Sequence, residues 1–154
     1  MEISKKTDYA IRMLAELVRN EGGIVSVRLA AEKNDVPYSF ARSIQHDLVR
    51  AGVVDSIRGS HGGMKLAIDP RTTTVRVVIE AIQGPICVAE YADDCPPQDD
   101  LHGFRSLWLQ ANYLLRDLFD SVTLYEVVME GRCPVLREGY QFEALTLEER
   151  TKLA

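Results

Sequence analysis

Hydrophobic and polar positions alternate with a helical period in the middle of the first half of the chain. Pro37 stops any preceding helix and is tolerated at the first turn of a new one, while Gly52 stands where a helix would end. Because side chains three or four positions apart share one face of a helix, that face is predicted to be buried. The predicted buried face consists of Phe40, Ile44, Leu48 and Ala51.

Two short strand-like runs follow this helix, at residues 53–57 and 64–68, with a basic, glycine-rich tip between them. Helix, strand, tip and strand in this order predict a winged helix. Gly59, Gly62 and Gly63 would permit positive φ angles and a tight reversal. The alternative is a plain hairpin whose turn residues are merely polar.

The segment before this unit supplies the rest of a helix-turn-helix. Residues 7–20 predict a first helix. Ser26 is expected to cap a second helix at residues 27–33, with Leu29 and Ala30 packing inward. The apolar stripe of the first helix is Ala10, Leu14, Leu17 and Val18.

The second half of the chain predicts three more helices. Thr74 is expected to cap one, and Thr123 and Glu126 form a capping box that opens a short one. Between them, residues 103–122 predict the longest helix, with an apolar surface wide enough to pack on its own domain and on a second copy. A homodimer is therefore expected; the alternative is a helix packed wholly within one chain. The apolar positions are Trp108, Ala111, Leu115, Leu118 and Val122, widened by Leu107, Leu114 and Phe119.

Composition and charge are those of a globular protein with an uneven charge distribution. The 154 residues are 46% hydrophobic and 27% charged, and no apolar run approaches the length of a membrane span. The N-terminus does not resemble a signal peptide, so a cytoplasmic protein with no membrane partner is expected. The net charge is −5, divided into +2 over residues 1–84 and −7 over residues 85–154. The sequence contains no recognisable nucleophile–base set and no phosphate-binding loop, so an enzyme is not expected.

The mildly basic half has the side chains expected of a DNA-binding surface. Recognition helices read base edges with their first residues, and cations on a thin wing suit the minor groove. The alternatives are an ordinary solvated helix, or a winged helix that binds only protein. The predicted DNA contacts are Ser26, Arg28, Tyr38, Ser39, Arg42, Ser43, His46, Arg58, Gly59, Ser60 and His61.

An aperiodic stretch at residues 84–102 precedes the longest helix and contains Cys87, Cys95 and His102. Thiolates with an imidazole suit an iron–sulfur cluster or zinc. Their spacing is looser than that of a zinc finger. The alternative is a set of structural or surface residues, and Cys133 is interpreted as a structural or incidental thiol.

Four stretches resemble the Rrf-two family of bacterial winged-helix transcription regulators, which includes the iron–sulfur-cluster biogenesis regulator and the nitric-oxide-sensing repressor. The resemblance implies a homodimer joined through the long helix and a loop able to hold a 2Fe–2S or 4Fe–4S cluster, although some members have none. The four stretches are TDYAIRMLAEL, VRAGVVDSIRGSHGGMKLA, TTVRVVIEAIQGP and SLWLQANYLLRDLFDSVTLYEVV.

The cluster loop departs from the usual three cysteines of that family. Cys87 and Cys95 match the first two, His102 occupies the third position, and Asp8 matches the acidic ligand that some members supply from the partner subunit. This set implies a cluster, with 2Fe–2S favoured, whose potential is raised by imidazole as in Rieske centres.

The sequence therefore predicts a mainly α fold with a small β-hairpin wing. Its expected parts are a DNA-binding domain (1–84), a sensor loop (85–102), a dimerisation helix with a short helix (103–130) and a C-terminal tail (131–154). The expected function is a homodimeric regulator, a repressor, that binds an inverted-repeat operator in double-stranded DNA and senses redox state, nitric oxide or iron–sulfur status. The alternative is a cluster-free regulator switched by a small molecule, a partner protein or thiol oxidation.

Overall fold

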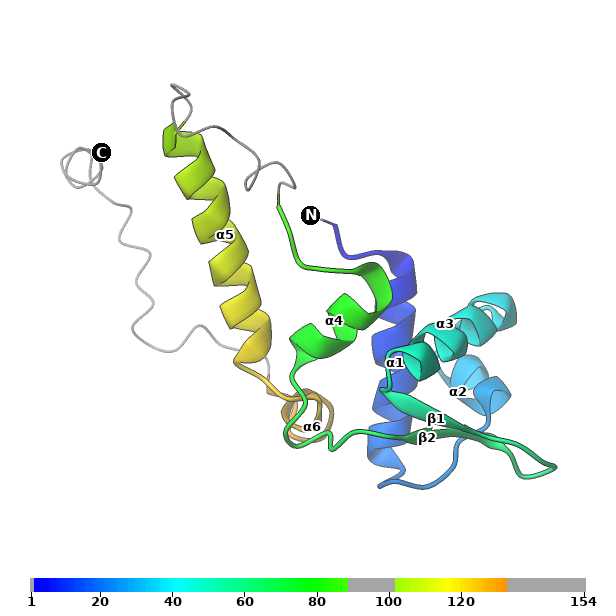
Figure 1. Cartoon of the computed structure of the whole chain (residues 1–154). Coiled ribbons are helices and arrows are strands. Elements are labelled where there is room, and N and C mark those ends of the chain that lie inside the picture. Colours follow the sequence, from blue (N-terminus) through cyan, green and yellow to red (C-terminus); the bar gives the residue numbers. More distant parts are fainter. Residues whose placement is uncertain (1, 89–101, 133–154) are drawn as a thin grey trace.

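The computed structural model describes residues 2–88 and 102–132, which form a mainly helical molecule with one antiparallel hairpin (Figure 1). This confirms the predicted fold class. The elements in chain order are α1 (Lys5–Arg19), α2 (Val27–Lys33), α3 (Tyr38–Arg50), β1 (Val54–Ile57), β2 (Gly63–Leu66), α4 (Val75–Gln83), α5 (His102–Asp120) and α6 (Leu124–Met129). Cys95, Cys133 and residues 134–154 lie outside the described residues.

The first helices begin where side-chain oxygens can satisfy free backbone N–H groups. Ser4 Oγ accepts from the Thr7 N–H at 3.1 Å, so α1 begins two residues before the predicted start. Ser26 Oγ accepts from the Leu29 N–H at 3.1 Å, and α2 has the predicted bounds. α3 follows Pro37 directly, and no side-chain hydrogen bond caps it.

One hydrophobic core joins α1, α2, α3, the base of the hairpin, α4 and α6. Its largest members are fully buried, and Leu124 brings the short α6 into the same core as the three N-terminal helices. Residues with at most 1% exposure in this core include Met13, Leu14, Leu17, Ile44, Leu48, Val53, Val54, Met64 and Val78.

The buried face of two helices differs from the prediction, at two positions in α3 and at one in α2. In α3 the buried line contains Ala41 rather than Phe40, which is 44% exposed, and Ala51 is exposed beyond the helix end. The small Ala41 lets α3 pack closely, while the ring of Phe40 meets Tyr9 edge-on with centroids 5.9 Å apart. In α2, Leu29 is 44% exposed, and Ala31 is buried beside Ala30.

The hairpin confirms the predicted wing, but its glycines serve two purposes. Val54 pairs with Leu66 and Ile57 with Gly63. Of the three wing glycines only Gly59 has a positive φ, of 118°, so Gly62 and Gly63 do not adopt the positive φ that a glycine permits. A Cβ on Gly62 would lie 2.3 Å from the Ile57 carbonyl oxygen, and one on Gly63 equally close to the Val25 oxygen. These two glycines allow close backbone approach.

The end of α5 is fixed to the start of α4. Thr74 occupies the predicted N-cap position, but its hydroxyl donates to Asp120 at 2.8 Å instead of capping the helix. Arg76 Nε donates to the same carboxylate at 2.7 Å, and the Val75 N–H donates to the Val122 carbonyl at 3.1 Å. The predicted capping box of α6 is confirmed. Figure 1 shows α5 standing apart from α1–α3, with α4 between them.

No helix among residues 2–88 and 102–132 combines the length and apolarity that crossing a membrane requires.

Candidate nucleic-acid interface and sensor segment

The outer face of α3 is polar and open to solvent, while its inner face is firmly packed. Ile44 and Leu48 are fully buried, which orients the opposite side of the helix away from the core. The predicted contact residues on this side are all exposed: Tyr38, Ser39, Arg42, Ser43 and His46.

Polar contacts connect α3 to α1 and to the first strand of the wing. Asp47, whose side chain is 13% exposed, accepts a hydrogen bond from the Lys6 ammonium on α1 and lies 3.4 Å from an Arg50 guanidinium nitrogen. The Lys6 hydrogen bond lowers the pKa of Asp47 against the opposing effect of burial, and Arg50 lowers it further. Gln45 Nε2 donates to Ser56 Oγ at 3.2 Å, which connects α3 to β1.

Asp47→Asn is expected to lower stability at neutral pH by on the order of 1 kcal/mol, since it weakens a partly exposed ion pair. The carboxyl pKa is lower in the folded protein than in the unfolded chain, so its contribution is complete above about pH 3.8 and is lost as pH falls through the folded value. Urea unfolding at decreasing pH should show the two proteins converging in acid. Asp55→Asn, at an exposed wing position, is the matched control.

The wing presents its polar tip to solvent. Arg58, Gly59, Ser60 and His61 are all exposed, and the hairpin carries them beyond the body of the molecule (Figure 1). The base of the wing is held to the core by the bridge between Val25 and Met64. A buried base with an exposed basic tip is the geometry that a minor-groove contact needs.

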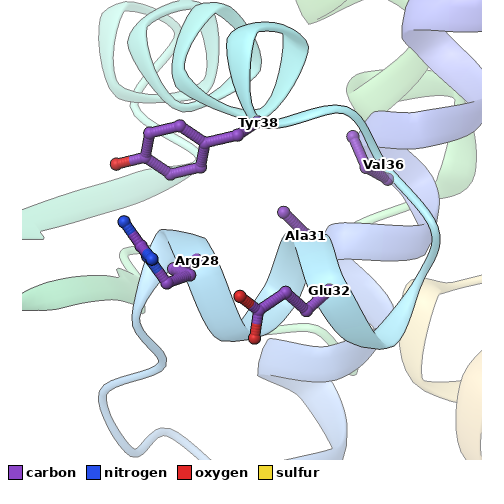
Figure 2. Close-up of a pocket in the computed structure, with 5 residues that line it drawn as sticks. All are labelled: Arg28, Ala31, Glu32, Val36 and Tyr38. Atoms are coloured by element: carbon purple, nitrogen blue, oxygen red, sulfur yellow. The ribbon is translucent and has the colours of Figure 1, made fainter.

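A hollow of about 290 Å³ lies between α2 and α3, beside the start of the recognition helix. It is lined by Arg28, Ala31, Glu32, Val36 and Tyr38. Figure 2 shows Arg28 of α2 and Tyr38 of α3 facing one another across it. The Arg28 guanidinium carbon is 5.6 Å from the centre of the Tyr38 ring, within the range of a cation–π contact.

The start of the segment predicted to be a sensor (residues 85–102) is attached to the long helix through Asn112, which is 7% exposed. Its Oδ1 accepts from the Val88 N–H at 2.6 Å, and its Nδ2 lies 3.8 Å from the half-buried Cys87 sulfur. Because the Val88 N–H can only donate, the amide must turn its own donor toward Cys87.

Two further side chains hold the residue before Cys87. The Ile86 N–H donates to Glu80 Oε1, and its carbonyl accepts from Arg116 Nε, both at 3.2 Å. Sequence reasoning did not identify Asn112, Arg116 or Glu80. The available signal was that Asn112 and Arg116, spaced four residues apart, place polar groups directly beside the apolar side of a long helix.

The other proposed cluster ligands are less completely placed. The Asp8 carboxylate lies in the first turn of α1, as predicted, and pairs with Arg12 at 2.8 Å, with both side chains about half exposed. His102 begins α5, but its side chain, like Cys95, lies outside the described part of the chain. The structure does not bring three or more His, Cys, Asp or Glu residues together as a metal site within residues 2–88 and 102–132.

A band of apolar side chains is exposed along α5. Phe104, Leu107 and Leu114 are 59%, 52% and 49% exposed, whereas Leu115 and Leu118 are only partly exposed. At about 100° per residue, the partly exposed Trp108, Leu115 and Phe119 lie between this band and the side of α5 that carries Asn112 and Arg116. Ser106, Gln110, Tyr113 and Asp117 occupy the remaining, mostly polar side.

Two helices joined by a tight turn, an exposed recognition helix and a basic wing define a winged helix-turn-helix, a class of DNA-binding protein. The family model described as "Rrf2: Iron-dependent Transcriptional regulator" matches residues 3–130. The chain belongs to this family, as the sequence resemblance implied, and is a DNA-binding transcriptional regulator.

Known relatives agree in sequence and in fold. The HTH-type transcriptional regulator CymR of Bacillus subtilis is 30% identical over 82% of this chain and 89% of its own. Its structure, described as that of the global cysteine regulator, superposes with a TM-score of 0.70 at 28% identity, covering 83% of this chain and 96% of that one. The structure of T. potens IscR gives 0.69 at 25% identity, covering 86% and 89%.

Proposed function

We propose that the chain acts as a homodimer that binds an inverted-repeat operator as a repressor, under the control of residues 85–102. The recognition helix contributes Ser39, Arg42 and Ser43 to the major groove, and Arg58 and His61 enter the minor groove. Residues 103–130 join the two subunits through the exposed band on α5. The observation that supports this most strongly is that an exposed polar face on α3 and an exposed basic wing are both held by one hydrophobic core.

Arg42→Ala is expected to relax preference at one or two base pairs by about 1–3 kcal/mol, because Arg pairs bidentately with guanine edges. Arg58→Ala is expected to weaken binding to all sequences more evenly. The measurement is operator and mutant-operator affinity over a range of salt concentrations, with Arg132→Ala beyond α6 as the control. Absence of salt-sensitive binding to any fragment near the protein's own promoter would refute the proposal.

For the sensor segment we propose an iron–sulfur cluster held by Cys87, Cys95 and His102, with Asp8 of the partner subunit. Two features of the described residues support this proposal. Cys87 is partly exposed and its sulfur faces an N–H donor, as cluster thiolates commonly do. The Asp8–Arg12 pair is exposed and therefore weak, so it can be exchanged for another partner at little cost. A bound cluster would supply redox and nitric-oxide chemistry.

Side chains of α4 and α5 would transmit a rearrangement of residues 85–102 to the rest of the protein. Asn112, Arg116 and Glu80 hold residues 86–88 against α4 and α5, so a rearrangement of the segment alters contacts on both helices. Because α5 is the proposed dimer helix, such a change resets the separation of the two recognition helices.

A cluster-free regulator, switched by a small molecule, a partner protein or thiol oxidation, is the second candidate. It is favoured by the similarity to CymR, the relative described as the global cysteine regulator of B. subtilis. In a cluster-free regulator, the contact between Cys87 and Asn112 would transmit the signal, because a chemical change at the sulfur disturbs that contact directly.

A further inference from the structure

The contact between Arg28 and Tyr38 joins two different helices of the helix-turn-helix at their starting ends. Arg28 lies in the first turn of α2 and Tyr38 begins α3. Tyr38 is 48% exposed, and the Arg28 guanidinium carbon lies 5.6 Å from the centre of its ring. An exposed arginine samples many rotamers unless another group holds it, and an aromatic face provides such a group.

The position of this pair determines what the guanidinium can reach. In a helix-turn-helix the first helix of the pair crosses the DNA backbone while the second enters the groove. A cation at the start of α2 is therefore directed at a phosphate rather than at a base edge. Glu32 also lines the hollow, and its negative charge disfavours an anion inside, which places the phosphate contact at the rim.

We propose that Tyr38 is a positioning residue: its ring holds the Arg28 guanidinium for a DNA phosphate, so the two residues act as a single contact. This inference rests on the proposed DNA-binding function and deepens it. On this view the tyrosine hydroxyl is dispensable, and the register of the protein on DNA depends on the α2–α3 geometry.

A double-mutant cycle with Arg28→Ala and Tyr38→Leu, beside Tyr38→Phe, tests the inference. Operator affinity is measured across a salt series. Arg28→Ala should reduce the slope of log K against log salt by about one, as expected for the loss of one phosphate contact. Tyr38→Leu should weaken binding about two- to fivefold, the equivalent of one exposed cation–π contact, and Tyr38→Phe should not. In the Arg28→Ala background, Tyr38→Leu should have no further effect.

Arg71→Ala provides a matched control, since the Arg71 guanidinium also lies over a tyrosine ring, 3.6 Å from the centre of Tyr125, near α6. Its salt slope should equal that of the wild type. If the double variant lost operator affinity by the product of the two single fold-changes, Arg28 and Tyr38 would be independent contacts and the inference would be wrong. It would also be wrong if Tyr38→Phe lost as much affinity as Tyr38→Leu. If Arg28→Ala left the slope of log K against log salt unchanged, this inference would be wrong but the proposed DNA-binding function would stand. If the wild type did not bind DNA, the proposed function would be wrong as well.

Discussion

Leu114→Asp is expected to convert the protein from a dimer into a folded monomer and to reduce operator affinity by about 10²–10⁴-fold, the gain that linking two binding modules supplies. Leu114 is 49% exposed within one chain, so a carboxylate there remains solvated in the monomer. In the proposed dimer the same carboxylate would be buried against apolar side chains, at a cost of several kcal/mol. Leu115 and Leu118 are less suitable targets, since both are partly covered within the protomer.

Ser106→Asp introduces the same charge on the polar side of the same helix and should leave the dimer intact. Light scattering gives the mass of each variant, and circular dichroism establishes that it is folded. A folded Leu114→Asp variant with the mass of a dimer would show that the exposed band on α5 is not the subunit interface.

Cys87→Ala and Cys95→Ala are each expected to abolish iron binding, because either change removes a thiolate from a set that contains only two. Wild type reconstituted anaerobically should contain both iron and sulfide. His102→Cys should retain the cluster at a lower reduction potential, since thiolate ligands stabilise the oxidised form more than imidazole does.

Cys133→Ala is the matched control, a thiol lost from outside the proposed ligand set, and its iron content should equal that of the wild type. Iron and sulfide analysis and the visible spectrum measure all four variants. A colourless wild type, or iron retained after loss of both Cys87 and Cys95, would exclude the cluster and leave the cluster-free regulator as the function of this segment.

Capping and periodicity rules predicted most of the fold, because its elements are short and their ends are marked by capping residues or glycine. Ser26, Gly52 and the Thr123–Glu126 capping box each determine an end of a helix through contacts within a few residues. Periodicity was less accurate about which side chain turns inward. Phe40 is more apolar than Ala41, but close packing of α3 against the core requires the smaller residue, and hydrophobicity alone does not include that constraint.

The parts of the candidate sites that could be predicted are those formed by exposed residues of a single helix or hairpin. The outer residues of α3 and the tip of the wing follow from helix and hairpin geometry. The groups on α5 that hold Cys87 and its neighbours do not, because Asn112 and Arg116 reach Val88 and Ile86 from 24 and 30 positions away, and only tertiary packing brings them together. The same applies to Lys6, which reaches Asp47 from 41 positions away.

The positions of the contacts along the long helix have a mechanical consequence. α5 has 19 residues and is therefore about 28 Å long. Its final turn is held to α4 by the Asp120 contacts with Thr74 and Arg76, whereas its first turn follows residues 85–101 in the chain. Asn112 and Arg116 also hold the middle of α5 to residues 86–88, so a displacement of that segment would act on the helix at these contacts, with the Asp120 contacts as the pivot. A tilt of about 10° moves its far end by about 5 Å. In the proposed dimer, a displacement of that size at the start of α5 would become a small rotation at the winged helix. A change of a few ångströms in the separation of the two recognition helices would then decide whether both half-sites of the proposed operator can be occupied together.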